Sequence, residues 1–275
     1  MKRPSPRQQK IAAAYDADIW PLGPMRAAEP LLRALPRHPG TVAFEYGCAT
    51  GRLTRSVAER LDDDSRVVAV DPSPAMIDVA NAGASLAPKI VFQPGDVTPL
   101  PVEAGSCDLV FSNLAFGDLP KPAETLVDFT RALKAGGRAL VTLPMRGSWG
   151  EFLDLYRDVL REHGKQEALA ALATYEKSFP DSATATRWLE GAGMTNVSVE
   201  TVRWEMLFKT AREFFFAPII ELFPLPIWKQ IAGGRGDEMQ DVFFFVKEAI
   251  ETYFSGTVFP VTMVVGLLQG DKRPS

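Results

Sequence analysis

Between residues 42 and 144, short apolar runs alternate with segments of helical periodicity. The runs are rich in Val, Ile, Leu and Phe, as in RVVAVD (66–71), KIVFQP (89–94) and RALVTLP (138–144). Continuous apolar strands that alternate with helices are typical of a mostly parallel sheet covered by helices on both faces. This alternation limits the chain to an α/β fold more strongly than any other feature.

Four further runs complete the expected sheet. TVAFEY (41–46) comes first, CDLVFSN (107–113) fourth, NVSVETVRW (196–204) sixth and TVFPVTMVVGLL (257–268) last. We therefore expect an α/β fold that is Rossmann-like and doubly wound, with a mostly parallel, seven-stranded sheet.

Two helical segments interrupt the alternation, at about 147–181 and 207–256. They follow the fifth and the sixth strand, so we expect them to be inserts in one domain of residues 24–275. Residues 1–23 are expected to form an N-terminal tail, loose over residues 1–10, and a short helix.

Composition excludes several classes of protein. The formal net charge of −4 argues against a nucleic-acid partner. The two cysteines, Cys48 and Cys107, form neither a disulfide framework nor a zinc pattern, so no metal site is expected and a reducing cytoplasm fits best. No stretch approaches the roughly 18 apolar residues of a membrane span. We expect a cytoplasmic protein with no membrane span.

The first strand runs into a glycine-rich turn, Glu45-Tyr-Gly47-Cys-Ala-Thr-Gly51-Arg, and a helix follows. A dinucleotide-binding turn needs a third glycine, which is absent, and a carboxylate at the strand end would repel a pyrophosphate. No Gly-Lys-Ser/Thr follows, which excludes a P-loop. The carboxylate of Glu45 suits a ligand with an ammonium or sulfonium group instead.

Further carboxylates follow the next two strands. Asp71 ends the second strand, where a carboxylate can accept from both hydroxyls of a ribose. Asp96 follows the third strand and could accept from an exocyclic amine. Open parallel sheets bind ligands outside the carboxyl ends of their strands. An ammonium group, a ribose and an adenine would each find a partner here; the alternative is that each carboxylate only caps a helix or a turn.

Taken together, FEYGCATGRLT, VVAVDPSPAMIDVA, GDVTPLP, CDLVFSNLAF and LKAGGRALVTLP resemble the class I S-adenosylmethionine-dependent methyltransferases. The most similar branch contains the ubiquinone and menaquinone C-methyltransferases and the malonyl-carrier-protein O-methyltransferase. The resemblance covers residues 10–145 motif by motif and residues 182–266 in layout. It implies S-adenosyl-L-methionine as cofactor and S-adenosyl-L-homocysteine as product.

The resemblance also implies roles for individual residues. The first turn would hold the methionine part of the cofactor, Asp71 the ribose and Asp96 the adenine amino group, while Tyr15 in an N-terminal cap helix closes over the site. Ala49 stands where the family usually has glycine, which tightens the approach of a ligand to the backbone. The implied cofactor-binding residues are Tyr15, Glu45, Gly47, Cys48, Ala49, Thr50, Gly51, Asp71, Pro72, Met76, Asp96, Val97, Asn113 and Leu114.

No general base is evident, so no catalytic residue is assigned. His38 precedes the first strand and His163 lies in the first insert. The stretch SNLA after the fourth strand lacks the DPPY-like tetrapeptide of enzymes that methylate base amino groups. We expect in-line transfer to a small or medium-sized, apolar or anionic acceptor, free or carrier-bound, such as a carboxylate, a phenolate or a similar oxygen or carbon nucleophile. The alternative is a non-catalytic cofactor-binding protein that acts through a protein partner.

The second insert is rich in phenylalanine, because ten of the 17 lie between Phe208 and Phe259. Consecutive helical residues point about 100° apart, so neither triplet, 214–216 or 243–245, can bury all its rings against one surface. We expect the inserts to form a lid over an apolar acceptor site. The alternatives are internal packing or a homodimer interface. The polar anchors expected in the acceptor site are Arg146, Trp149, Tyr175 and Arg203.

Overall fold

The computed structural model describes residues 4–36, 38–83, 89–95, 100–119, 121–234 and 236–274. In this part of the chain, seven strands form one sheet in the order β3-β2-β1-β4-β5-β7-β6. The pairs β1–β2, β1–β4, β2–β3 and β4–β5 are parallel. The expected seven-stranded, mostly parallel α/β fold is confirmed. The strands are β1 (Val42–Tyr46), β2 (Arg66–Asp71), β3 (Ile90–Pro94), β4 (Cys107–Asn113), β5 (Leu133–Pro144), β6 (Met194–Phe208) and β7 (Phe259–Lys272).

The chain divides into two compact units. Unit 1 comprises Met1–Leu143, Asp181–Val202 and Val265–Ser275, and unit 2 comprises Pro144–Pro180 and Arg203–Val264. The two segments of unit 2 overlap the inserts expected from the sequence. That these segments close over an acceptor site stays a prediction.

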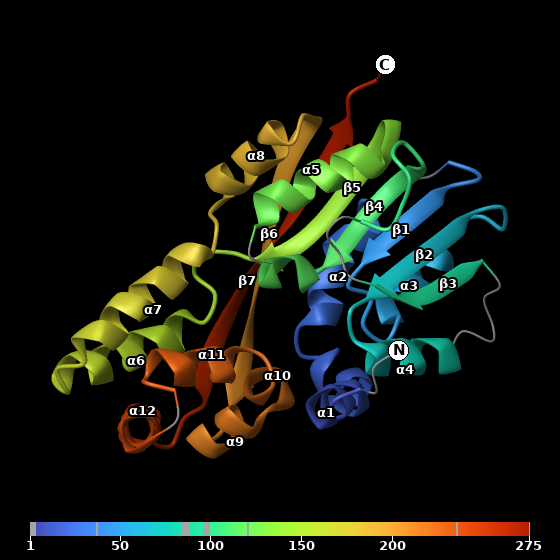
Figure 1. The fold of residues 1–275 in the computed structure, drawn as a ribbon. Helices are drawn as coiled ribbons and strands as arrows, with labels where there is room; N and C mark the ends of the chain where they lie inside the picture. The colour runs from blue at the N-terminus through green and yellow to red at the C-terminus, as the bar shows by residue number, and fades with distance from the viewer. Residues whose placement is uncertain are drawn as a thin grey trace. The chain divides into compact units, whose positions relative to one another are not determined.

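In unit 1, helices cover both faces of the sheet. Helices α2 (Pro24–Arg33), α3 (Arg52–Ala58) and α4 (Pro74–Ala82) lie on one face, and α5 (Pro122–Ala132) and α8 (Ser182–Gly191) lie on the other (Figure 1). The apolar stripe that predicts α3 is buried against the sheet, together with alanines and phenylalanines of β1, β3 and β4. Its members are Leu53, Val57 and Leu61. Helix α3 begins directly after the glycine turn and ends at Ala58, so Leu61 of the stripe lies three residues past its end.

The N-terminal segment becomes helical earlier than expected. Helix α1 spans Pro6–Ala14, with proline at its first position. The Ser5 hydroxyl accepts from the Gln8 N–H, and the Gln8 side chain accepts from the Ser5 N–H at 2.8 Å, which is a capping box. The prediction of a loose tail over residues 1–10 is therefore wrong from Pro6 onward. A π-helix, η1 (Tyr15–Ile19), follows α1 directly.

Unit 2 is helical in both of its segments. The first holds α6 (Gly150–Glu162) and α7 (Gln166–Ser178), which separate at Gly164, a residue with φ of +67°. The second holds α9 (Ala211–Phe216), α10 (Pro218–Glu221), α11 (Pro224–Ile231) and α12 (Asp237–Tyr253), where prolines begin two of the four helices. Among the described residues, no helix combines the length and the apolar character that crossing a membrane requires.

Candidate functional site

The order of the strands puts the switch point of the sheet between β1 and β4. The chain passes from β1 outward through β2 to β3, and then returns to β4 on the other side of β1. Ligands of open α/β sheets bind outside the carboxyl ends of the strands at such a point. The ends of β1 and β4 here are the glycine turn (residues 47–51) and the segment that begins at Asn113.

The glycine turn is fixed by backbone hydrogen bonds to β2. The N–H groups of Gly47 and Cys48 both donate to the Val70 carbonyl, at 2.9 and 3.0 Å, and the Gly51 N–H donates to the Cys48 carbonyl at 2.8 Å. The turn then passes directly into α3. Backbone hydrogen bonds alone therefore attach the turn to the sheet.

Both glycines are required by their conformation and by their neighbours. Gly47 has φ of +71° and Gly51 has φ of +76°. A Cβ atom on Gly47 would lie 2.2 Å from the Cβ of Ala115, and one on Gly51 would lie 2.4 Å from the ring of Phe92. Ala49 also has a positive φ, of +47°, which costs an L-residue about 1–2 kcal/mol. The turn thus stores backbone strain at Ala49.

Asp71 braces this turn from the end of β2. One carboxylate oxygen accepts from the Ala49 N–H at 2.9 Å, and the other accepts from the Ser73 N–H at 2.8 Å. Burial raises the pKa of Asp71, and these two hydrogen bonds oppose the shift. Each oxygen keeps a second lone pair for a ligand hydroxyl. Asp71 can therefore shape the turn and bind a ligand at once.

Glu45 is the other buried carboxyl of the site, with 1% of its surface exposed. Its Oε2 accepts from the hydroxyl of Thr54, in the first turn of α3. Burial raises the pKa of Glu45 to about 8; the Thr54 hydrogen bond and Arg55 lower it, and Asp71 raises it. A carboxyl in this state is largely protonated at neutral pH unless a cation enters the site.

Tyr15 and Cys48 lie beside these carboxyls. Burial raises the pKa of the Tyr15 hydroxyl, and the charges of Glu45, Asp71 and Asp16 raise it further. Burial likewise raises the pKa of the Cys48 thiol, with Glu45 as the next cause. Both side chains are neutral, so they give the site apolar walls and no nucleophile.

The end of β4 is organised by the protein itself. The Asn113 amide donates to the Pro24 carbonyl at 2.9 Å and accepts from the Thr142 hydroxyl at 2.7 Å. The Leu114 N–H donates to the Thr142 carbonyl and to its hydroxyl, each at 3.0 Å. Leu114 has φ of +63°, and non-glycine residues held in this conformation cluster at functional sites. The side chain of Asn113 positions the strand end, and the backbone of Leu114 borders the site.

The remaining residues expected at the site divide into three groups. Met76 is buried and packs with Ala12 and Ala75, whereas Pro72 is exposed. The hydroxyl of Thr50 donates to Asp16 rather than standing free. Asp96 and Val97 lie outside the described residues. The structure thus brings together the residues of the first turn, Tyr15 and Asp71.

Sequence reasoning missed two participants. The Thr54 hydroxyl donates to the Glu45 carboxyl. The Asp16 carboxylate accepts from the Thr50 hydroxyl and also lies 3.1 Å from Nε of Arg52. The sequence analysis assigns Asp16 no role at the site. Nothing in the local pattern distinguishes it from Asp18, which is exposed.

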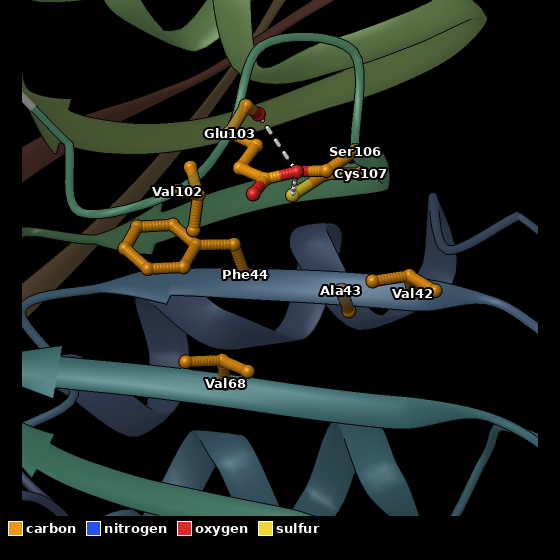
Figure 2. Close-up of a pocket in the computed structure, with 8 residues that line it drawn as sticks. All are labelled: Val42, Ala43, Phe44, Val68, Val102, Glu103, Ser106 and Cys107. Carbon is orange, nitrogen blue, oxygen red and sulfur yellow. Dashed lines mark hydrogen bonds between the residues drawn. The ribbon is translucent and has the colours of Figure 1, made fainter.

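A separate cavity of about 190 Å³ lies at the opposite ends of the strands. Figure 2 shows the side chains around it, which come from the starts of β1 and β4, from β2 and from the loop before β4. The Ser106 hydroxyl donates to the Glu103 carbonyl at 2.7 Å. The cavity is distinct from the glycine turn. It is lined by Val42, Ala43, Phe44, Val68, Val102, Glu103, Ser106 and Cys107.

The rings of unit 2 pack largely against one another. Phe152 stacks on Trp228 with ring centroids 4.0 Å apart, and Phe214 contacts both rings. The Tyr156 hydroxyl donates to the Trp228 carbonyl at 2.7 Å. In contrast, Phe216 is 67% exposed. Internal packing therefore buries Phe214 of the first triplet but not Phe216.

The polar anchors expected in unit 2 have protein partners. Arg203 donates to the Thr262 hydroxyl at 3.1 Å, and Trp149 packs edge-on against Trp228. The two histidines also have partners of their own. His38 faces the Thr41 hydroxyl before β1, and His163 stacks on Phe245 in unit 2.

Residues 44–141 match the family model described as a methyltransferase domain. These residues are a methyltransferase domain. The matched range contains the glycine turn, Asp71 and the end of β4, so the motif resemblance seen in the sequence is confirmed. The domain belongs to the S-adenosylmethionine-dependent methyltransferases.

Several curated relatives of the methyltransferase domain carry methyltransferase names. A trans-aconitate 2-methyltransferase of Azoarcus sp. is 28% identical over 62% of this chain and 74% of its own length. One of Deinococcus radiodurans is 34% identical over 42% of this chain and 43% of its own length. A malonyl-[acyl-carrier protein] O-methyltransferase of Marinomonas sp. is 32% identical over 45% of both chains. In the last two, the match spans less than half of the relative.

Solved structures share the fold over most of the chain. A putative methyltransferase of Bacillus halodurans has a TM-score of 0.59 at 16% identity, over 90% of this chain and 98% of that chain. Phosphoethanolamine N-methyltransferase 2 of Haemonchus contortus, solved with S-adenosyl-L-methionine, has a TM-score of 0.58 at 16% identity, over 97% of this chain and 57% of that chain. At such identities the likeness establishes the fold alone.

Proposed function

We propose that the protein transfers a methyl group from S-adenosyl-L-methionine to a small or medium-sized acceptor that is apolar or anionic. The observation that carries this proposal is the glycine turn at the switch point, braced by Asp71 and flanked by the buried carboxyl of Glu45. When bound, the cofactor supplies an electrophilic methyl group on a positively charged sulfur.

The residues of the turn fit this cofactor. Glu45 and Asp71 are buried acids whose pKa values are raised although Arg55 lies near Glu45, so the site has room for a further positive charge. A ligand with an ammonium and a sulfonium group supplies one, and the remaining lone pairs of Asp71 can accept from ribose hydroxyls. Pyrophosphate would add negative charge beside two carboxyls, which disfavours a nicotinamide dinucleotide at this turn.

The protein's own contribution to catalysis is positioning and exclusion of water. Tyr15 and Cys48 stay neutral beside the carboxyls and present apolar surface there. In-line displacement at a sulfonium needs an aligned acceptor in a water-poor site more than it needs an acid or a base. An acceptor that is already an anion, such as a carboxylate or a phenolate, suits a site without a general base.

The names of the relatives agree with such acceptors. Trans-aconitate and a malonyl group both carry carboxyl groups, and these are the acceptors named for the Azoarcus and Marinomonas proteins. A second candidate function is cofactor binding without catalysis, through a protein partner. The strained Ala49 favours this non-catalytic function, because its Cβ atom leaves less room for a ligand to approach the backbone of the turn.

Turnover separates the two candidates. The protein should transfer labelled methyl from S-adenosyl-L-methionine to at least one member of a panel of carboxylic acids and phenols, detected by mass spectrometry. Asp71→Ala should lose this transfer, whereas Asp78→Ala, which removes an exposed carboxylate on α4, should keep it. Cofactor binding with no transfer to any acceptor would favour the non-catalytic function.

A further inference from the structure

The N-terminal segment has apolar contacts on both sides of Asp16. Ala12 of α1 packs on Ala75 and Met76 of α4, with Ile11, Tyr15 and Ala49 beside them. Ile19, three residues after Asp16, is 1% exposed. These apolar contacts place the segment beside the glycine turn, and polar contacts then fix Tyr15 and Asp16 against the turn.

Asp16 supplies those contacts. Its Oδ1 accepts from the Thr50 hydroxyl at 2.6 Å, and its Oδ2 lies 3.1 Å from Nε of Arg52. Thr50 is fully buried, whereas the Asp16 and Arg52 side chains are 34% and 47% exposed. One carboxylate thus joins the N-terminal segment to the turn and to the first residue of α3.

The backbone conformation of this segment places Asp16 within hydrogen-bond distance of Thr50. Tyr15 and Asp16 begin the π-helix η1, which the Trp20 N–H closes on the Tyr15 carbonyl at 2.7 Å. Single π-helical turns are rare and occur frequently at functional sites. Because Tyr15 and Asp16 are adjacent, anchoring Asp16 also sets the position of Tyr15 beside Glu45 and Asp71.

We propose that Asp16 is a positioning residue that latches the N-terminal segment over the bound cofactor and thereby controls cofactor release. The proposal rests on the proposed function, since it requires S-adenosyl-L-methionine at the glycine turn. The buried Thr50 hydrogen bond is the main part of the latch. The exposed Arg52 pair is weakened by salt.

The test is the rate at which labelled S-adenosyl-L-methionine leaves the full-length protein when chased with excess unlabelled cofactor. Asp16→Ala should release it at least tenfold faster than the wild type. Asp16→Asn, which keeps an acceptor for Thr50 but loses the charge, should fall between them. The control is Asp18→Ala, which removes the exposed carboxylate of the same π-helix and should release at the wild-type rate.

Two further measurements separate a latch from a fold defect. Thr50→Val should speed release and should add little to Asp16→Ala in the double variant, because both changes break one contact. Trypsin cleavage after Lys10 should be slowed by S-adenosyl-L-homocysteine in the wild type and not in Asp16→Ala. Release at the wild-type rate from Asp16→Ala that still binds would overturn the latch alone, whereas a wild type that binds no cofactor would overturn the proposed function with it.

Discussion

Glu45 should make cofactor affinity depend on pH. Burial raises its pKa from 4.5 to about 8, so the free site holds a protonated carboxyl at neutral pH. A cationic ligand is bound by the ionised form, and binding must therefore release a proton. Two pH units below its pKa, about 1% of a carboxyl is ionised, which weakens binding about 100-fold, or ~2.7 kcal/mol. The Kd for S-adenosyl-L-methionine should therefore be about 100-fold higher at pH 6 than above pH 8.

Titration calorimetry between pH 6 and 9, in two buffers of different ionisation enthalpy, measures both the affinity and the released proton. Adenosine, which has neither cationic group, should bind with a much flatter pH profile. Glu45→Gln should weaken S-adenosyl-L-methionine far more than adenosine and should abolish the proton release. The reasoning is refuted if wild type and Glu45→Gln show the same pH profile, or if both ligands weaken equally.

The same pKa shift should lower the stability of the unliganded protein as the pH rises. A carboxyl whose pKa is raised on folding stabilises fully below its unfolded value and loses that contribution as the pH passes through its folded value. For Glu45 this window runs from 4.5 to about 8, with a slope of at most about 1.4 kcal/mol per pH unit. Thermal unfolding at pH 5 and pH 8 should show the loss in the wild type and not in Glu45→Gln; equal losses would contradict the assignment.

Other predictions concern single side chains. Asp71→Ala should weaken cofactor binding by about 1–3 kcal/mol, and unchanged affinity by calorimetry would count against its role. Ala49→Gly should relieve strain at φ of +47° and raise the melting temperature or the cofactor affinity. If neither value rises, the backbone at Ala49 is not strained. Gly51→Ala should lower stability by denaturant titration, because its Cβ would meet Phe92; a wild-type midpoint would contradict this. Phe214→Ala should cost about 3–5 kcal/mol of stability while the exposed Phe216→Ala costs under about 0.5, and similar costs would refute the packing in unit 2.

The fold of unit 1 could be predicted because its signals are local. Each apolar run between residues 42 and 144 forms a strand, and Leu53, Val57 and Leu61 pack as their spacing indicates. The glycine turn could be predicted because Gly47 and Gly51 lie between an apolar strand and a helical pattern, and both glycines take a positive φ in the structure. The early start of α1 was also readable, since Ser5 and Gln8 form a capping box by sequence spacing.

The partners of the site residues could not be predicted, because they come from distant parts of the chain. Asn113 donates to Pro24, which lies 89 positions away, and Asp16 accepts from Thr50, 34 positions away. Sequence spacing carries no information on such pairs. The π-helix could not be predicted either, because no pattern in residues 15–19 distinguishes a π-helix from an α-helix. These contacts decide whether a carboxylate binds ligand or protein, which composition and periodicity leave open.

A crystal structure of the protein with S-adenosyl-L-homocysteine tests the central claim most directly. We predict the product at the carboxyl ends of β1, β2 and β4, with ribose hydroxyls within hydrogen-bond distance of Asp71 and the amino group facing Glu45. Product bound elsewhere, for example in the cavity lined by Val42 and Cys107, with Asp71 retaining only Ala49 and Ser73, would contradict the account.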